Sequence, residues 1–145
     1  MSEPTTPPYR GSCLCGEIRY EVDQIGPKMG HCHCSMCRKF HGAGFTTYGE
    51  ADAEHFRWVA GEHLLQSYKA HNGTVRRFCR QCGSSLTFAS SNDSGKVVEF
   101  ALGTLDSDIP CRPDVHIFVG SKANWSRIDD DLPQYEGDRQ SQRIK

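Results

Sequence analysis

Short runs of apolar and β-branched residues recur along the chain, separated by turns rich in glycine. The runs lie at Glu17 to Val22, Gly44 to Tyr48, Phe56 to Val59, Leu64 to Tyr68, Thr74 to Phe78, Ser85 to Phe88 and Val97 to Leu102. Most of them are too short for a helix, and β-branched and aromatic residues favour strands. The pattern therefore predicts a mainly β fold of packed antiparallel sheets.

Local turn signals refine this prediction. The segment WVAGEHLLQSYK alternates in part and turns at Gly61–Glu62, which predicts a β-hairpin. VRRFC then leads into a second turn, after which SLTF continues as a strand. One short helix is predicted from Ser35 to Phe40, because Ser35 suits its first cap position and Gly42 its end. The last third of the chain has three prolines and isolated aromatic residues, so we expect it to be largely irregular.

The length of 145 residues is that of one ordinary domain. Because the ends are rich in proline or polar residues, we expect a flexible N-terminal arm over residues 1–10, a single folded domain over 11–137 and a polar C-terminal tail over 138–145. Seventeen basic and eighteen acidic residues give a net charge of -1. Such a chain has no overall field that attracts nucleic acid or an anionic membrane, so we expect neither as a partner.

Cysteine usage changes the picture. No apolar run approaches the roughly 20 residues that span a bilayer, and the first residues lack the apolar segment of a secretory signal, so a cytoplasmic location is expected. That compartment keeps thiols reduced, yet the chain has eight cysteines. Buried free cysteines would be scattered, whereas seven of these are clustered as CxC, CxCxxC and CxxC. Metal binding is therefore the leading interpretation.

Four cysteines predict a closed structural metal site. In GSCLCGEIRY the spacing of two places Cys13 and Cys15 on one face of a strand. In FCRQCGSSL, Cys79 and Cys82 have the CxxC spacing of a tight turn around a metal, and Gly83 relieves the turn. Four thiolates complete a tetrahedral site, so this metal would contribute to folding stability.

Three cysteines in HCHCSMC predict an open site. Cys32, Cys34 and Cys37 supply only three sulfurs, and a zinc ion with three protein ligands keeps its fourth position for water or substrate. We therefore predict that these three are the catalytic metal ligands. Zinc is favoured over an iron–sulfur cluster because paired thiolate turns suit it.

Two alternatives stay open at this point. A histidine could close the second site, with His31, His33, His41 and His116 as candidates, although the alternation of a strand turns His31 and His33 away from Cys32. Cys13 and Cys15 could instead pair with the HCHCSMC cluster. In either case Cys111 stands alone between prolines and is given no ligand role.

Five segments resemble one known family. GSCLCGEIRYEV, HCHCSMCRKFHGAGF, FCRQCGSSL, ALGTLD and HIFVGSKANW occur in this order. They resemble the glutathione-dependent formaldehyde-activating enzymes (GFA), a family that also includes the centromere protein V type proteins. The resemblance implies a zinc-stabilised β-tent fold. It also implies two zinc ions per chain, a structural one on Cys13, Cys15, Cys79 and Cys82 and a catalytic one on Cys32, Cys34 and Cys37.

The family resemblance also implies a reaction. It is a carbon–sulfur lyase activity like that of S-(hydroxymethyl)glutathione synthase, in which glutathione or a similar thiol adds to formaldehyde or another aldehyde. Arg38, Lys39 and Lys122 are candidate cations for the carboxylates of such a thiol, although each fits an ordinary surface role better. The alternative function is a non-catalytic, zinc-stabilised binding module, or one that responds to zinc or to thiols, since fold does not fix function.

Overall fold

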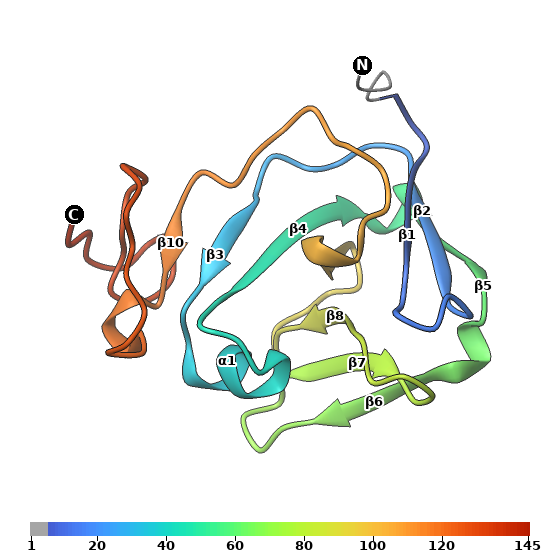
Figure 1. Ribbon diagram of the computed structural model, residues 1–145, viewed down its shortest axis with the longest axis horizontal. Helices are drawn as coiled ribbons and strands as arrows, with labels where there is room; N and C mark the ends of the chain where they lie inside the picture. The colour runs from blue at the N-terminus through green and yellow to red at the C-terminus, as the bar shows by residue number, and fades with distance from the viewer. Residues whose placement is uncertain (1–5) are drawn as a thin grey trace. The chain divides into compact units, whose positions relative to one another are not determined.

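The computed structural model describes residues 6–145, and within them the prediction of a mainly β fold is confirmed (Figure 1). This part of the chain forms ten strands in two sheets, with one α-helix and four short 3₁₀ helices. It divides into two compact units, each built from two separate segments of sequence. The first unit holds Gly49–Cys111 and the described residues before Lys28, and the second holds Lys28–Tyr48 and Arg112–Lys145.

Two groups of strands make up the first unit. A three-stranded antiparallel sheet has the order β1-β2-β5, and the second group has the order β4-β9-β8-β7-β6. Their bounds are β1 Tyr9–Ser12, β2 Arg19–Val22, β4 Thr46–Asp52, β5 Phe56–Ala60, β6 Leu65–Lys69, β7 Val75–Cys79, β8 Ser85–Ala89 and β9 Val97–Ala101. The 3₁₀ helices η1 Ala53–His55 and η2 Glu62–Leu64 join strands of this unit, and η3 Leu102–Thr104 follows β9. β4 begins in the second unit.

The predicted hairpin at Gly61–Glu62 is wrong. β5 pairs with β2, and β6 pairs with β7. Gly61 has a φ of 73°, and its carbonyl accepts a hydrogen bond from Leu64 N, so the chain turns through η2 instead of folding back on itself. A Cβ atom at Gly61 would lie 2.2 Å from the Glu17 carbonyl oxygen, which only glycine avoids. The second predicted turn is confirmed, since β7 and β8 are antiparallel neighbours.

Aromatic rings fill the core of the first unit. The buried Tyr20 ring stacks on Phe56 at 5.0 Å between centroids. It makes an edge contact with Trp58 at 5.9 Å and packs at a tilt against Phe100 at 5.8 Å. Burial raises the pKa of the Tyr20 hydroxyl, which hydrogen-bonds to Thr104 Oγ1 at 2.7 Å. Cys13 and Cys79 belong to the same buried cluster. Two of the predicted metal ligands are therefore fixed by the packing of this core.

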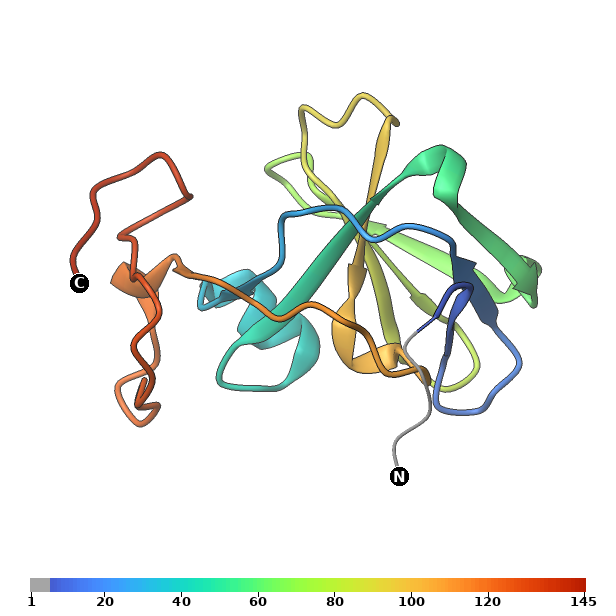
Figure 2. The ribbon, with the colours of Figure 1, turned by 90° about the horizontal axis from the view of Figure 1, so that it is seen from above.

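The second unit contains little regular structure. Its strands have the order β10-β3-β4, with β3 at Gly30–Cys32 and β10 at His116–Ile117, and its helices are α1 Ser35–His41 and η4 Val119–Ser121. The predicted helix is thus present, but its N-cap is Cys34 and not Ser35, because Cys34 Sγ accepts a hydrogen bond from Cys37 N. Gly42, with a φ of 62°, ends it as expected. The last part of the chain, orange to red in Figure 2, is largely loop.

The two ends contain more hydrogen-bonded structure than the sequence suggested. Residues 1–5 of the predicted arm 1–10 lie outside the described residues, while Tyr9 and Arg10 already belong to β1. In the predicted tail, Ile144 N donates to the Gln134 carbonyl and Gln134 N donates to the Lys145 carbonyl. None of the helices between residues 6 and 145 has the length and apolar composition that crossing a bilayer requires. The boundaries of one domain at 11–137 stay a prediction.

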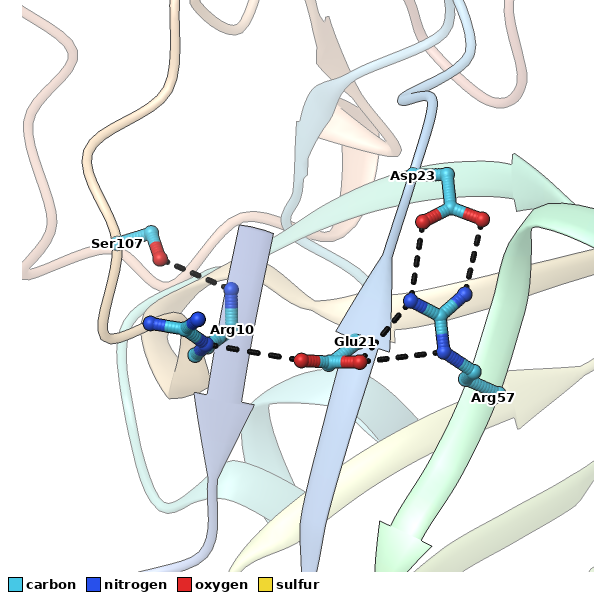
Figure 3. Close-up of polar contacts among 5 residues, drawn as sticks. All are labelled: Arg10, Glu21, Asp23, Arg57 and Ser107. Atoms are coloured by element: carbon cyan, nitrogen blue, oxygen red, sulfur yellow. Dashed lines mark hydrogen bonds and ion pairs between the residues drawn. The ribbon is translucent and has the colours of Figure 1, made fainter. Parts of the chain in front are cut away.

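An ion-pair network lies on the exposed face of the three-stranded sheet (Figure 3). Arg57 lies between two carboxylates: its Nη1 is 2.8 Å from Asp23 Oδ2, and its Nη2 is 2.9 Å from Glu21 Oε1. Arg10 adds a longer contact of 3.6 Å to the other Glu21 oxygen, and its backbone N–H donates to Ser107 Oγ. Hydrogen bonds from Arg57 lower the pKa of Asp23 below its ordinary value of 3.8.

This network predicts a specific acid response. A carboxyl whose pKa is lowered by folding stabilises the protein above its unfolded pKa, and the contribution is lost as the pH falls through its folded pKa. We therefore expect Asp23→Asn to lower the melting temperature at pH 6, and the difference from the parent protein to shrink below about pH 3.8. Thermal melts from pH 6 to pH 2.5 measure this. A difference that stays constant over that range would contradict the assigned role of Asp23.

Candidate metal centre

Four cysteine sulfurs meet in the first unit. The Sγ atoms of Cys13, Cys15, Cys79 and Cys82 all lie within 4.8 Å of one another, and we call them the four-thiol group. Cys13 Sγ is 3.5 Å from Cys15 Sγ, which is 3.9 Å from Cys79 Sγ. Tetrahedral zinc with bonds of about 2.3 Å to sulfur separates its sulfurs by about 3.8 Å. The spacing of the four-thiol group therefore fits one tetrahedral metal ion.

Two tight turns at strand ends build the four-thiol group. After β1, Gly16 N donates to the Cys13 carbonyl at 3.0 Å, and Gly16 has a φ of 80°. After β7, Gly83 N donates to the Cys79 carbonyl at 2.7 Å, and Gly83 has a φ of 82°. Each glycine occupies a left-handed conformation that other residues rarely adopt. Each turn thus presents two sulfurs from one short loop. The CxxC turn is as predicted, but Cys13 and Cys15 lie in a turn after β1 and not on one face of a strand.

The four sulfurs do not ionise alike. Burial raises the pKa of Cys82, but hydrogen bonds from Ser84 outweigh it and lower the pKa to about 5. At Cys15 the hydrogen bond from the Glu17 backbone lowers the pKa, but burial together with contacts to the other three thiols raises it to about 11. A group of thiols that repel each other as thiolates needs a cation to hold all of them ionised. The electrostatics of the four-thiol group therefore also fit a metal ion.

Three more sulfurs meet in the second unit. Cys32 Sγ, Cys34 Sγ and Cys37 Sγ lie within 4.8 Å of one another, and we call them the three-thiol group. Cys32 ends β3, Cys34 caps α1 and Cys37 lies in the first turn of that helix. Cys32 and Cys37 are buried, whereas Cys34 is partly exposed. Contacts with Cys34 and Cys37 raise the pKa of Cys32, and burial raises it further.

The predicted histidines make contacts of their own. The three-thiol group includes no histidine nitrogen within the same 4.8 Å. His31 Nδ1 is 2.8 Å from Thr47 Oγ1, and the His31 ring stacks on His116 at 4.8 Å. His41 Nε2 is 2.8 Å from Tyr48 Oη. The described residues thus group the sulfurs as four and three, which is the division that the spacing favours.

A series of hydrogen bonds runs from the exposed Asp130 through the buried His116 to the buried His33. Both Asp130 carboxylate oxygens lie 3.0 Å from His116 Nε2, and His116 Nδ1 lies 2.9 Å from His33 Nε2. The hydrogen bond from His116 lowers the pKa of Asp130. Burial, with the nearby charges of His116, His31 and Lys122, lowers the pKa of His33 to about 4. His33 is therefore neutral at neutral pH, and the Asp130 carboxylate accepts the Nε2 proton of His116.

The sequence around Asp130 does not predict this series of hydrogen bonds. Asp130 lies in a run of three acidic residues, IDDDL, which reads as a solvated loop. Only the fold brings it to His116, which the sequence named without assigning it a catalytic role. The described residues hold one more group of potential ligands, Asp52, Glu54 and His55, but it is largely exposed and typical of an ordinary acidic surface. Cys111 belongs to none of these groups.

Two of the three predicted cations contact backbone oxygens. Arg38 Nη2 donates to the Ser121 carbonyl at 3.4 Å, and Lys122 Nζ donates to the carbonyls of Ala123 and Ser126. Among residues 6–145, neither Arg38 nor Lys122 has a carboxylate within ion-pair distance. Both charges thus remain available to an acidic ligand. Lys39 follows Arg38 in the last turn of α1, whereas Lys122 follows η4.

Comparison with known proteins agrees with this geometry. Residues 8–121 match the glutathione-dependent formaldehyde-activating enzyme family. The chain is 33% identical over 129 residues to a protein of Halomonas elongata named as a candidate glutathione-dependent formaldehyde-activating enzyme, with 82% of this chain and 80% of that protein covered. It is 30% identical over 86 residues to an uncharacterized lyase of Schizosaccharomyces pombe, and this match covers 59% of this chain and 61% of that protein.

A solved structure shares the fold. The crystal structure of a Rhodobacter sphaeroides protein superposes with a TM-score of 0.57 at 24% identity, covering 70% of this chain and 91% of the other. The family match spans well over half of the chain and includes all seven clustered cysteines. The resemblance seen in the sequence motifs is thereby confirmed, and the chain belongs to the glutathione-dependent formaldehyde-activating enzyme family.

Proposed function

We propose that this protein is a zinc-dependent carbon–sulfur lyase that resembles S-(hydroxymethyl)glutathione synthase and adds glutathione or a similar small thiol to formaldehyde or another aldehyde. We assign one zinc ion to the four-thiol group as a structural ion and a second to the three-thiol group as the catalytic one. The observation that carries the proposal is the difference in number, since Cys32, Cys34 and Cys37 gather without a fourth cysteine, histidine or carboxylate ligand among residues 6–145. Family membership supports the class of reaction.

The chemistry follows from the ligand set. A zinc ion held by these three thiolates would keep one position for a substrate and would lower the pKa of a thiol there, so that the thiol ionises near neutral pH. Three thiolates already place three negative charges around a dication, so Cys32, Cys34 and Cys37 favour capture of a thiol over activation of a carbonyl oxygen. Buried Cys32 and Cys37 keep water from one side, and the partly exposed Cys34 marks the open side.

The reaction balances without an oxidant or a reductant. A bond forms between the thiol sulfur and the carbonyl carbon while the carbon–oxygen π bond breaks, and the proton lost by the thiol ends on the oxygen. In the reverse direction the carbon–sulfur bond breaks, which makes the enzyme a lyase. Holding the thiol beside the aldehyde removes the entropy cost of their encounter and supplies much of the acceleration.

The cations of the second unit support an acidic thiol. Glutathione carries two carboxylates, and an arginine binds a carboxylate through two parallel hydrogen bonds. Arg38 follows Cys37 directly on α1 and has no carboxylate partner among the described residues. Lys122 lies next to Ser121, the backbone contact of Arg38. We propose that these two charges hold the carboxylates of the thiol, and that simple thiols without carboxylates bind more weakly.

Calorimetric titration of the zinc-loaded protein with glutathione tests the proposal. We expect a binding heat with glutathione, a smaller one with 2-mercaptoethanol, and only weak binding of S-methylglutathione, which keeps the carboxylates but has no free thiol. Adding formaldehyde to the glutathione-loaded protein should then form the hydroxymethyl adduct faster than in solution. If no free thiol gives a binding heat, the enzyme assignment is wrong and a zinc-stabilised binding module is favoured.

A further inference from the structure

Thr46 has a buried hydroxyl without a partner. This residue begins β4, and only 4% of its surface is exposed. Its Oγ1 is closed to solvent and makes no hydrogen bond to the described part of the chain. A hydroxyl buried in this way destabilises the folded protein, because it loses its bond to water and gains none in return. A buried polar atom without a partner is rare in folded proteins, and it often marks the place of an ion or a functional group.

The strand register places this hydroxyl beside the three-thiol group. Thr46 pairs with Cys32 across antiparallel β3 and β4, and directly opposite residues of such a pair share one face with Cβ atoms about 4.5–5.5 Å apart. Thr47, the next residue, pairs with His31, and its hydroxyl lies 2.8 Å from His31 Nδ1. The side chains of the two threonines therefore lie on opposite faces of the sheet, and that of Thr46 lies on the same face as the Cys32 side chain.

In this conformation no acceptor, the Cys32 sulfur included, meets the distance and angle of a hydrogen bond to the Thr46 hydroxyl. A protonated thiol is a weak hydrogen-bond acceptor, whereas a thiolate carries a full charge and accepts strongly. Cysteine binds a metal ion as the thiolate. We propose that Thr46 is a positioning residue of the three-thiol site, and that its hydroxyl rotates to donate a hydrogen bond to Cys32 Sγ when that sulfur binds the metal. The proposal rests on the proposed metal site, but not on the identity of thiol or aldehyde.

This hydrogen bond would act on the metal through Cys32. It spreads the negative charge of a buried thiolate and so stabilises the metal-loaded form. Groups that hydrogen-bond to metal ligands typically change metal affinity by about 10–100-fold. The Thr46 hydroxyl has no hydrogen-bond partner before the metal binds and gains one when it binds. It therefore destabilises the metal-free protein and stabilises the metal-loaded form.

Thr46→Val tests the proposal, since valine has the shape of threonine without the hydroxyl. In protein that carries zinc only on the four-thiol group, we expect the melting temperature to rise. Affinity for the second Zn²⁺, measured against a chromophoric chelator, should fall about 10-fold. With Co²⁺ in the second site, the sulfur-to-metal absorption band should move to longer wavelength, because the unbonded thiolate gives up its electrons more readily. Thr46→Ser should restore both the affinity and the band.

Thr47→Val is the matched control on the opposite face. It removes the contact to His31, so we expect a lower melting temperature, an unchanged affinity for the second Zn²⁺ and an unchanged Co²⁺ spectrum. If Thr46→Val binds the second ion and absorbs as the parent protein does, the assigned role of Thr46 is wrong. If the parent protein takes up only one Zn²⁺ per chain, the three-thiol site itself fails, and the proposed function fails with it.

Discussion

Cys82→Ala is expected to unfold the protein at temperatures where the parent protein is stable. The change removes one of four sulfurs that lie within 4.8 Å, and the remaining three bind zinc far more weakly. Structural zinc contributes on the order of 10 kcal/mol to folding, so we expect the free energy of unfolding to fall by about 5 kcal/mol or more. Thermal melts followed by circular dichroism, with metal content measured on the same samples, test this.

The position of the four-thiol group in the fold explains the size of this effect. Cys13 and Cys15 follow β1, whereas Cys79 ends β7, and 64 residues separate Cys15 from Cys79. A metal ion that joins these loops closes a long stretch of chain, which an unfolded polypeptide does only at a large entropic cost. Cys13 and Cys79 are also buried in the aromatic core, so loss of the ion exposes that core to water.

Cys111→Ala is the matched control for Cys82→Ala. Cys111 is also only partly exposed, but it belongs to neither sulfur group. We expect a change in stability of less than about 1 kcal/mol and unchanged metal content. The parent protein treated with a strong chelator should melt like Cys82→Ala. A Cys82→Ala variant that keeps two zinc ions and melts with the parent protein would show that the four-thiol group has no structural role.

Local patterns predicted the strands and the sulfur groups well. Alternating apolar runs gave β7 and β8, and the CxC and CxxC spacings gave both halves of the four-thiol group, because these features depend on neighbours in sequence. Which strand pairs with which depends instead on residues that are distant in sequence. The turn at Gly61 looks like a hairpin in sequence, but its glycine is required by the close approach of the Glu17 carbonyl, which only the folded chain shows.

Features that depend on distant contacts were missed for the same reason. Ser35 has the stronger preference for a helix N-cap, yet Cys34 takes that role, because its backbone is extended and its sulfur accepts the hydrogen bond from Cys37 N. Asp130 meets its partner His116 only in the folded chain. Thr46 is one of two adjacent threonines, and only the pairing with β3 tells them apart.

Cys34→Ala should abolish turnover and leave the first unit folded. Cys34 is partly exposed and lies outside the four-thiol group, so its loss leaves the structural ion in place. The variant loses the sulfur that caps α1, which typically costs about 1 kcal/mol. It also leaves only two sulfurs for the second ion. We expect adduct formation from glutathione and formaldehyde to fall to its rate in solution, with one zinc ion retained per chain.

Cys34→Ser separates the two roles of this side chain. A serine hydroxyl still accepts a hydrogen bond from Cys37 N, so the cap and the melting temperature should be close to those of the parent protein. Its oxygen does not replace a thiolate as a zinc ligand, so turnover should be lost as it is in Cys34→Ala. If Cys34→Ala and Cys34→Ser are equally inactive but differ in melting temperature, the loss of turnover comes from the missing metal ligand and not from the missing helix cap. Turnover by either variant at the parent rate would move the reaction away from the three-thiol group.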